Sequence, residues 1–171
     1  MTYPGLFRRD GEFCVTTLGN PEVAILRRVF TETANLVTAP PVGDPITERL
    51  FPVVYPDDRE EAAEFRRLTE EDLRTEKSHQ IGVVLSCLPD RSGGVRLDGE
   101  QAEAWLRALT DARLALGIKV DIADDTDLSD EIDDAAMRDP TGVRAMQLSV
   151  YGYLTYMQES LVEALESTPL V

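Results

Sequence analysis

Residues 98–117 read DGEQAEAWLRALTDARLALG, a strongly periodic pattern of apolar and polar side chains. Asp98 and Gln101 have the spacing of a capping box, in which two side chains bond the free backbone N–H groups that begin a helix. Gly117 is suited to end that helix, because glycine readily adopts the left-handed backbone found there. The apolar residues between them recur at helical intervals and predict an amphipathic helix over 102–116: Ala102, Trp105, Leu106, Leu109 and Leu116.

A second and longer helical pattern runs from about residue 140 to 166. Asp139-Pro140 is a typical start signal, since proline is tolerated in the first turn of a helix. Because these two helices contain the bulkiest apolar groups, we expect them to form the centre of the fold. Apolar groups on more than one side would also allow packing against a second copy, so a homodimer is an alternative. The stripe consists of Val143, Met146, Val150, Leu154, Met157, Leu161 and Leu165.

Proline and glycine divide the preceding part of the chain into shorter segments. Asn20-Pro21 is a helix start in which Asn20 would be the cap, and it predicts a helix over 21–37. A short helix over 44–51 follows and is cut off by Pro52, which cannot continue a helix.

The next helical segment begins at Asp57-Asp58 and contains a second start signal. Thr69 and Asp72 are spaced like a capping box, with aspartate in place of the usual glutamate or glutamine. We therefore expect a break or kink at Thr69 and a separate helix that carries an apolar stripe over 73–88.

Short β-prone segments lie between the helices. Residues 12–18 predict a strand after the Asp10-Gly11 turn, and residues 95–97 predict a partner strand. The alternation over 118–122 fits a small third strand. The fold class is therefore mainly α with a minimal β element: five to six helices in a bundle-like single domain over 1–171, with a short two- or three-stranded sheet.

Residues 121–139 hold nine acidic residues against the single basic residue Arg138, a local charge of −8. This composition predicts a solvated, mobile loop. A calcium loop needs ligands at its positions 1, 3, 5 and 12 with glycine at 6. Neither register fits: a loop starting at Asp121 places Ala123 third, and one starting at Asp125 places Ala136 twelfth. No metal site is predicted here.

The charge of the whole chain disfavours direct binding of nucleic acid, because 32 acidic residues oppose 17 basic ones and give a net charge of −15. No apolar run is long enough for a membrane span, and the first residues lack the order of a signal peptide, so we expect a cytoplasmic protein without membrane contact. The chain has one histidine, His79, and no P-loop, dinucleotide or zinc-protease motif. We therefore predict no catalytic residues, no metal and no cofactor, and favour a non-enzymatic protein over an enzyme with an unrecognised site.

Cys14 and Cys87 lie 73 positions apart and form no CxxC pair. Free cysteines are usually buried as small apolar residues. The alternative is a redox-sensing pair that forms a disulfide under oxidation, which requires Cα atoms within about 7 Å.

Arginine doublets stand out against the acidic background. Arg27-Arg28 and Arg66-Arg67 would lie on helices, and Arg74 could share a face with Arg67. Such residues usually form surface ion pairs with glutamates three or four positions away. The alternative is a binding patch for an acidic partner, formed by Arg27, Arg28, Arg66, Arg67 and Arg74.

Four separated motifs in this order resemble an actinobacterial family, the domain of unknown function DUF2017. They read EFRRLTEEDLR at 64–74, VRLD at 95–98, AWLRALTDARLALG at 104–117 and YLTYMQESL at 153–161. The resemblance implies a cytoplasmic protein whose gene tends to lie near the adaptor of the Clp protease and a cluster for sulfur transfer and cysteine synthesis. It also implies a redox-responsive role in transcription, acting with a sigma factor. The family has no established catalytic residues to carry over.

From these observations we expect a regulatory protein that binds protein partners in transcriptional or oxidative-stress control, a sigma factor or RNA polymerase being the partner. The alternative is an accessory factor of Clp-dependent proteolysis, with a Clp component as the partner.

Overall fold

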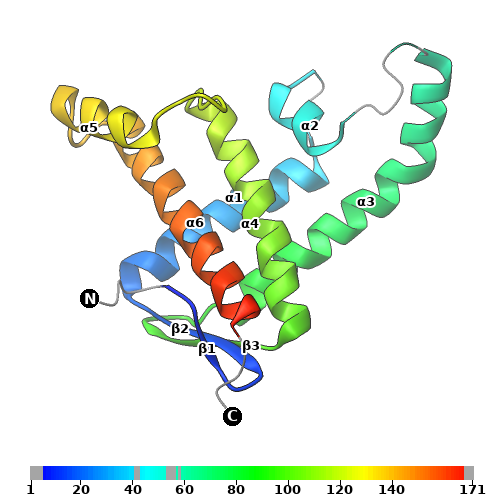
Figure 1. Ribbon diagram of the computed structural model, residues 1–171. Helices are drawn as coiled ribbons and strands as arrows, with labels where there is room; N and C mark the ends of the chain where they lie inside the picture. Colours follow the sequence, from blue (N-terminus) through cyan, green and yellow to red (C-terminus); the bar gives the residue numbers. More distant parts are fainter. Residues whose placement is uncertain (1–5, 41–42, 53–56, 58, 168–171) are drawn as a thin grey trace.

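The computed structural model describes residues 6–40, 43–52, 57 and 59–167. Within these ranges the fold is mainly α with a small antiparallel sheet, as the helical periodicity predicted (Figure 1). The strands are β1 (Arg8–Asp10), β2 (Phe13–Leu18) and β3 (Gly93–Leu97). The helices are α1 (Asn20–Thr38), α2 (Pro45–Leu50), α3 (Arg59–Cys87), α4 (Gly99–Lys119), α5 (Leu128–Arg138) and α6 (Val143–Glu166).

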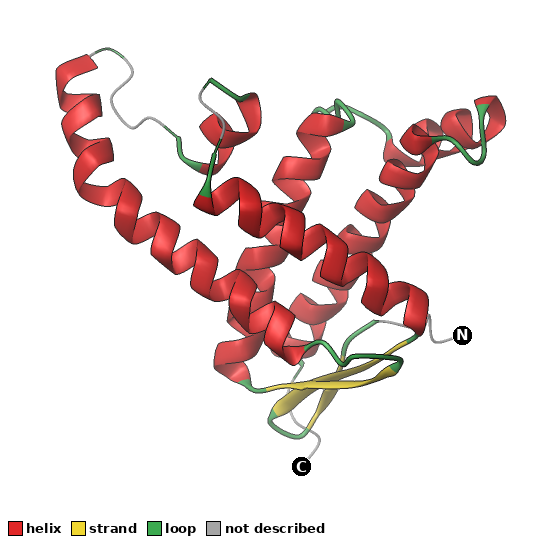
Figure 2. Ribbon diagram, turned by 180° about the vertical axis from the view of Figure 1, so that it is seen from behind, coloured by secondary structure: helices red, strands yellow, loops and turns green. Residues whose placement is uncertain are grey.

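Helix α4 lies at the centre of the helical layer, where it packs against α1, α2, α3 and α6. Both views show α1 crossing one side of the α4–α6 pair, with the sheet at one end of the bundle (Figures 1 and 2). Trp105 of α4 is fully buried there, with the Phe7 ring edge-on at 5.5 Å and the Phe30 ring at 6.4 Å. The prediction that α4 and α6 form the centre of the fold is therefore confirmed.

The predicted capping box at the start of α4 is present. The Asp98 carboxylate accepts a hydrogen bond from the Gln101 backbone N–H, and the Gln101 side chain accepts one from the Asp98 N–H. At the start of α1, however, the cap is Gly19 and not Asn20. The Asn20 side chain instead accepts a hydrogen bond from the Ser92 N–H at 2.7 Å, which ties α1 to the loop before β3.

The sheet has the order β1-β2-β3 with both pairings antiparallel. The predicted pairing of residues 12–18 with 95–97 is confirmed, since Thr16 faces Val95 and Cys14 faces Leu97. Gly11 has a positive φ of 62° in the turn between β1 and β2, a conformation that glycine adopts without strain. The third strand is β1, not residues 118–122.

The expected strand over 118–122 is wrong because α4 continues through Gly117 to Lys119. Gly117 is a buried helical residue, and a Cβ atom there would lie 3.3 Å from the Tyr151 ring. The glycine therefore allows α4 and α6 to approach closely and does not end the helix at residue 116.

The expected break at Thr69 is also wrong, because α3 is continuous from Arg59 to Cys87. The Thr69 hydroxyl donates to the Phe65 carbonyl at 2.7 Å, a bond within the helix that replaces the capping interaction. The N-terminal part of α3 extends away from the other helices (Figures 1 and 2).

The expected loop over 121–139 contains helix α5 from Leu128 to Arg138, so the loop prediction is wrong for these residues. Asp127 caps the helix by accepting hydrogen bonds from the Ser129 and Asp130 N–H groups. Ala135 packs with Val120, Ala145 and Leu148 in a second apolar cluster, which provides the burial that favours helix over loop here.

Candidate functional site

Cys14, the first redox candidate, lies in the central strand β2 with its side chain on the inner face of the sheet. Only 1 % of the residue is exposed. Burial raises the pKa of its thiol, an effect that the nearby positive charge of Arg9 partly offsets. A thiol rather than a thiolate is therefore present at neutral pH, and the thiolate is the reactive form.

Cys87, the second candidate, is the last residue of α3. It is half-buried and packs against the edge of the main core cluster, to which Cys14 also belongs. Both cysteines are free thiols in this structure. The two candidates thus differ in access: a reagent in solution reaches Cys87 more readily than Cys14.

Arg27 and Arg74, two of the partner-binding candidates, bond backbone carbonyls at the ends of neighbouring helices. The Arg27 guanidinium donates to the Pro89 carbonyl at 3.2 Å, just after α3. Arg74 donates to the Val37 carbonyl in the last turn of α1 at 2.6 Å, and its guanidinium lies 5.1 Å from the centre of the Phe51 ring. Since Arg27 and Val37 are ten residues apart on α1, about 15 Å along the axis, these two arginines do not form one patch.

Arg28 and Arg67 form exposed ion pairs of the kind expected for a helix surface. Arg28 pairs with Glu32 at 3.1 Å, and Arg67 lies 3.9 Å from Glu64. Such exposed pairs contribute little to stability. The side chain of Arg66 lies outside the described part of the structure, although its backbone belongs to α3.

A buried charged pair joins α3 to α4. Lys77 Nζ lies 2.7 Å from Asp111 Oδ1, and the side chains are 15 % and 6 % exposed. The second carboxylate oxygen of Asp111 is buried without a hydrogen-bond partner. Desolvation raises the pKa of Asp111 and outweighs the opposite effect of Lys77.

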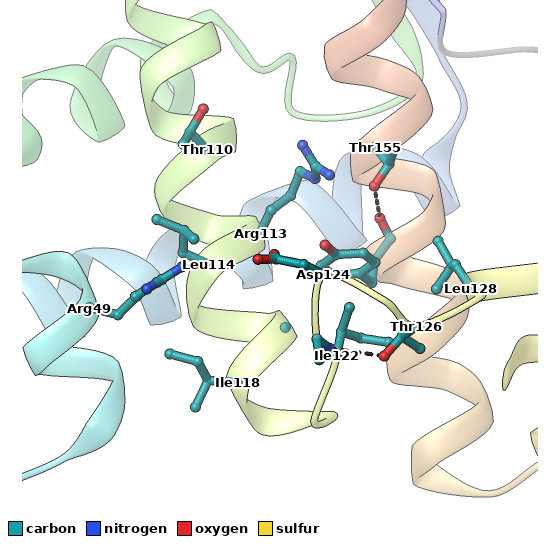
Figure 3. A pocket seen from close by; sticks show the side chains of 13 residues that line it. Arg49, Thr110, Arg113, Leu114, Ile118, Ile122, Asp124, Thr126, Leu128 and Thr155 are labelled. Atoms are coloured by element: carbon teal, nitrogen blue, oxygen red, sulfur yellow. Dashed lines mark hydrogen bonds between the residues drawn. The ribbon is translucent and has the colours of Figure 1, made fainter.

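A cleft of about 690 Å³ opens between α4, α6 and the loop that joins α4 to α5 (Figure 3). One wall is apolar, and two arginines and one aspartate add charge. In Figure 3, Arg49 reaches toward the cleft from α2, and Asp124 enters it from the loop. The lining residues are Arg49, Thr110, Arg113, Leu114, Gly117, Ile118, Ile122, Ala123, Asp124, Thr126, Leu128, Tyr151 and Thr155.

The sequence did not indicate Arg49 and Arg113 as candidate binding residues, because neither belongs to an arginine doublet or was placed on a helix face with one. No pattern in the sequence marks Arg113, because the burial of Asp111 two residues before it is known only from the structure. That it lines a cleft depends on Tyr151 and Gln158 of α6, about 40 residues away along the chain.

The described ranges also bear on metal binding and on membrane insertion. No group of three or more histidine, cysteine, aspartate or glutamate side chains in these ranges is placed to hold a metal ion. None of the helices described combines the length and the apolar character needed to cross a membrane.

Comparison with known proteins relates the chain to one family. Residues 4–165 match the sequence profile described as "Domain of unknown function (DUF2017)". A Mycobacterium leprae protein named as an oxidative stress regulator, AosR, is 34 % identical over 140 residues, which cover 73 % of this chain. The oxidative stress regulator AosR of Mycobacterium tuberculosis is 30 % identical over 138 residues, or 70 % of this chain.

The aligned region is only part of those relatives, covering 60 % of the Mycobacterium leprae protein and 57 % of the Mycobacterium tuberculosis protein. No solved structure matches the chain significantly.

Proposed function

Since this chain belongs to the DUF2017 family, we propose that it regulates the response to oxidative stress and does so by binding a protein partner of the transcription machinery. The observation that carries the proposal is the alignment, over 70 % and 73 % of this chain, with mycobacterial proteins named oxidative stress regulators. The family profile matches residues 4–165, from β1 to almost the end of α6, so the shared segment is a folded unit and not an isolated motif.

The surface supports a protein partner. Large apolar side chains are exposed where α5 meets α6, with Met137 86 % exposed, Val143 68 % and Met146 56 %. Groups of exposed apolar residues commonly mark protein interfaces. The net charge of −15 favours a basic partner surface over nucleic acid.

Within this proposal Cys87 is the residue that responds to oxidant. Its half-buried thiol at the end of α3 is accessible, whereas Cys14 is buried and its raised pKa disfavours the thiolate. Oxidation of Cys87 would add polar oxygen or a mixed disulfide beside the core and change the packing of α3 at this end of the molecule.

A pulldown with the full chain as bait, from cells grown with and without peroxide, tests the proposal. We expect a sigma factor or RNA polymerase to be recovered in an amount that changes with peroxide. The Cys87→Ser variant should lose that change, and Cys14→Ser should retain it. Recovery of no transcription component under either condition would contradict the proposed partner. Recovery of the Clp adaptor or its unfoldase instead would favour the role in proteolysis.

A further inference from the structure

We propose that the cleft between α4, α6 and the α4–α5 loop binds a small organic carboxylate, whose head group lies on Arg113, whose charge is also attracted by Arg49 in the same lining, and whose aliphatic body lies on the apolar wall. The inference does not depend on the proposed regulatory function. The cleft volume of about 690 Å³ is in the range typical of small-molecule sites, roughly 300–1,000 Å³.

The first observation is a pair of arginines without acidic partners. Neither Arg49 nor Arg113 forms an ion pair with any carboxylate in the described ranges, although the chain has 32 acidic residues. The exposed arginines 28, 67, 96, 107, 138 and 144 pair with an acidic side chain. Arg8 and Arg91 are exposed and, like Arg49, form no ion pair within the described ranges. The cleft lining thus carries two arginines against a single acidic residue, Asp124, and has a net positive charge in an acidic protein.

The second observation is that Arg113 is held in place before any ligand arrives. Its Nη1 donates to the Gln158 side-chain oxygen at 2.7 Å, and its guanidinium lies 5.4 Å from the centre of the Tyr151 ring. Gln158 is itself fixed, because its amide donates to the Thr110 hydroxyl at 2.7 Å. The bond to Gln158 occupies Nη1, Nε is buried without a hydrogen-bond partner, and Nη2 makes no hydrogen bond to a described residue. A fixed guanidinium loses little entropy on binding and suits a carboxylate oxygen.

The third observation is the apolar wall beside the charged groups. Leu114 and Ile118 lie one turn apart on α4, and Ile122 and Leu128 continue the wall from the loop and the start of α5. Their side chains are aliphatic and half-buried. A ligand with only a charged head, such as acetate, would leave this wall in contact with water. An aliphatic chain would cover it and gain binding affinity with each methylene that it buries.

Asp124 gives the proposal a distinctive consequence. Its exposed carboxylate enters the cleft on the side facing Arg49 (Figure 3) and repels a carboxylate head group. Removing that charge should strengthen the binding of an anion and leave the binding of an uncharged ligand unchanged.

The test uses octanoate as the probe, with 1-octanol and acetate as probes that lack the charge or the chain, and binding is measured by NMR titration of the full chain. We expect saturable octanoate binding that perturbs the signals of Leu114, Ile118 and Ile122, with 1-octanol and acetate binding at least tenfold more weakly. Arg113→Gln should weaken octanoate binding about tenfold, as expected for loss of one charge-assisted bond.

Two further variants distinguish an effect on ligand binding from an effect on folding. Arg49 is exposed, so Arg49→Gln should weaken octanoate binding several-fold without a change in stability, and Asp124→Asn should strengthen it. The control is Arg28→Gln, an exposed arginine of α1 outside the cleft lining, which should bind like the parent. No saturable binding of octanoate, equal binding of 1-octanol, or unchanged affinity in Arg49→Gln and Asp124→Asn would each overturn the proposal.

Discussion

Lys77 and Asp111 place opposite charges where α3 packs on α4. One carboxylate oxygen of Asp111 bonds Lys77 at 2.7 Å, and the other is buried without a partner. Desolvation raises the pKa of Asp111 even though Lys77 lies beside it. The lysine therefore compensates a charge that would otherwise be costly to bury, and its removal should affect stability strongly.

We expect Lys77→Met to lower the free energy of unfolding at pH 7 by about 3 kcal/mol, because a buried carboxylate is left without its counter-charge. A carboxyl group with a raised folded pKa contributes most stability when protonated, below its unfolded pKa of about 3.9, and loses that contribution as the pH rises through the folded pKa. The loss of unfolding free energy in Lys77→Met should therefore become smaller as the pH falls. Urea unfolding between pH 4 and 8 measures both effects.

The matched control is Arg107→Met, which removes an exposed pair with Glu76 at 2.9 Å. Exposed pairs contribute at most about 1 kcal/mol, so this variant should remain close to the parent at every pH. Equal losses in the two variants, or a deficit of Lys77→Met that does not change with pH, would show that Asp111 is not the buried charge we infer.

Arginine side chains illustrate what residue identity alone predicts. The i,i+3 pair of Arg67 with Glu64, which is exposed, and the i,i+4 pair of Arg74 with Glu70, which is half-buried, were expected from spacing and are present. The bonds from Arg27 and Arg74 to carbonyls at other helix ends were not, because these partners are 62 and 37 residues away. Spacing along one helix cannot indicate which carbonyls another helix brings close.

The close contact between α4 and α6 depends on a glycine in the last turn of α4. Gly117 is buried, and a Cβ atom there would lie 3.3 Å from Tyr151 Cε2. Gly82 of α3 provides the contrast, since nothing lies within 4 Å of a Cβ at that position. Both glycines are helical and carry an intrinsic cost relative to alanine, which is about 1 kcal/mol in a helix interior such as that around Gly82 and smaller in the last turn of α4.

Substituting each glycine by alanine should separate the effect of helix propensity on stability from the effect of packing against Tyr151. We expect Gly82→Ala to raise the free energy of unfolding by about 0.5–1 kcal/mol. Gly117→Ala should gain less, because the Tyr151 ring must shift, and Gly117→Val should lose about 1–3 kcal/mol through overpacking. Thermal unfolding followed by circular dichroism measures the stability of each variant and tests this predicted ranking. A gain for Gly117→Ala equal to that of Gly82→Ala would show that α4 and α6 do not meet closely at this point.

Helices α3 and α5 show how elements depart from their local signals. The Thr69 and Asp72 spacing is a genuine start signal, yet the Thr69 hydroxyl satisfies the Phe65 carbonyl inside a longer helix. In α5 the acidic composition suggested a loop. Asp127 caps the helix, the Glu131 carboxylate accepts a bond from Arg144 at 2.8 Å, and Ala135 packs with residues of α6. Contacts with a neighbouring helix outweigh weak propensity in such cases.

At the scale of the whole molecule, Trp105 connects the N-terminal segment, α1 and α4. It is the single tryptophan of the chain and is fully buried, in ring contact with Phe7 and Phe30. Its indole N–H is buried without a hydrogen-bond partner. The residue therefore contributes apolar contact and no compensating polar bond.

We expect Trp105→Ala to lower the free energy of unfolding by about 3–5 kcal/mol, as for other large aromatic residues removed from a core. Trp105→Phe should cost clearly less, because it keeps an aromatic ring and removes the unsatisfied N–H group. Tyr156→Ala, at a position that is 63 % exposed, should stay within about 0.5 kcal/mol of the parent. Denaturant unfolding followed by circular dichroism compares the three. A loss for Trp105→Phe as large as that for Trp105→Ala would contradict a purely apolar role.

The amino-acid sequence by itself determined the mainly α class, the presence of α1, α4 and α6, the pairing of the strand at 13–18 with that at 93–97, and the family resemblance. It did not determine every helix end, since α4 continues through Gly117 to Lys119 and α6 begins at Val143 and not at Pro140. Capping signals and hydrophobic periods are properties of a few consecutive residues, so they can be recognised without the fold. Only the tertiary structure decided that α3 is continuous, that α5 is a helix, that Arg27 and Arg74 bond distant carbonyls, and that Arg113 faces a cleft with Arg49. Each of these depends on partners from other elements, such as Gln158, which is 45 residues from Arg113 along the chain. Such partners are determined by burial and close packing between distant elements, which a pattern of neighbouring residues does not indicate.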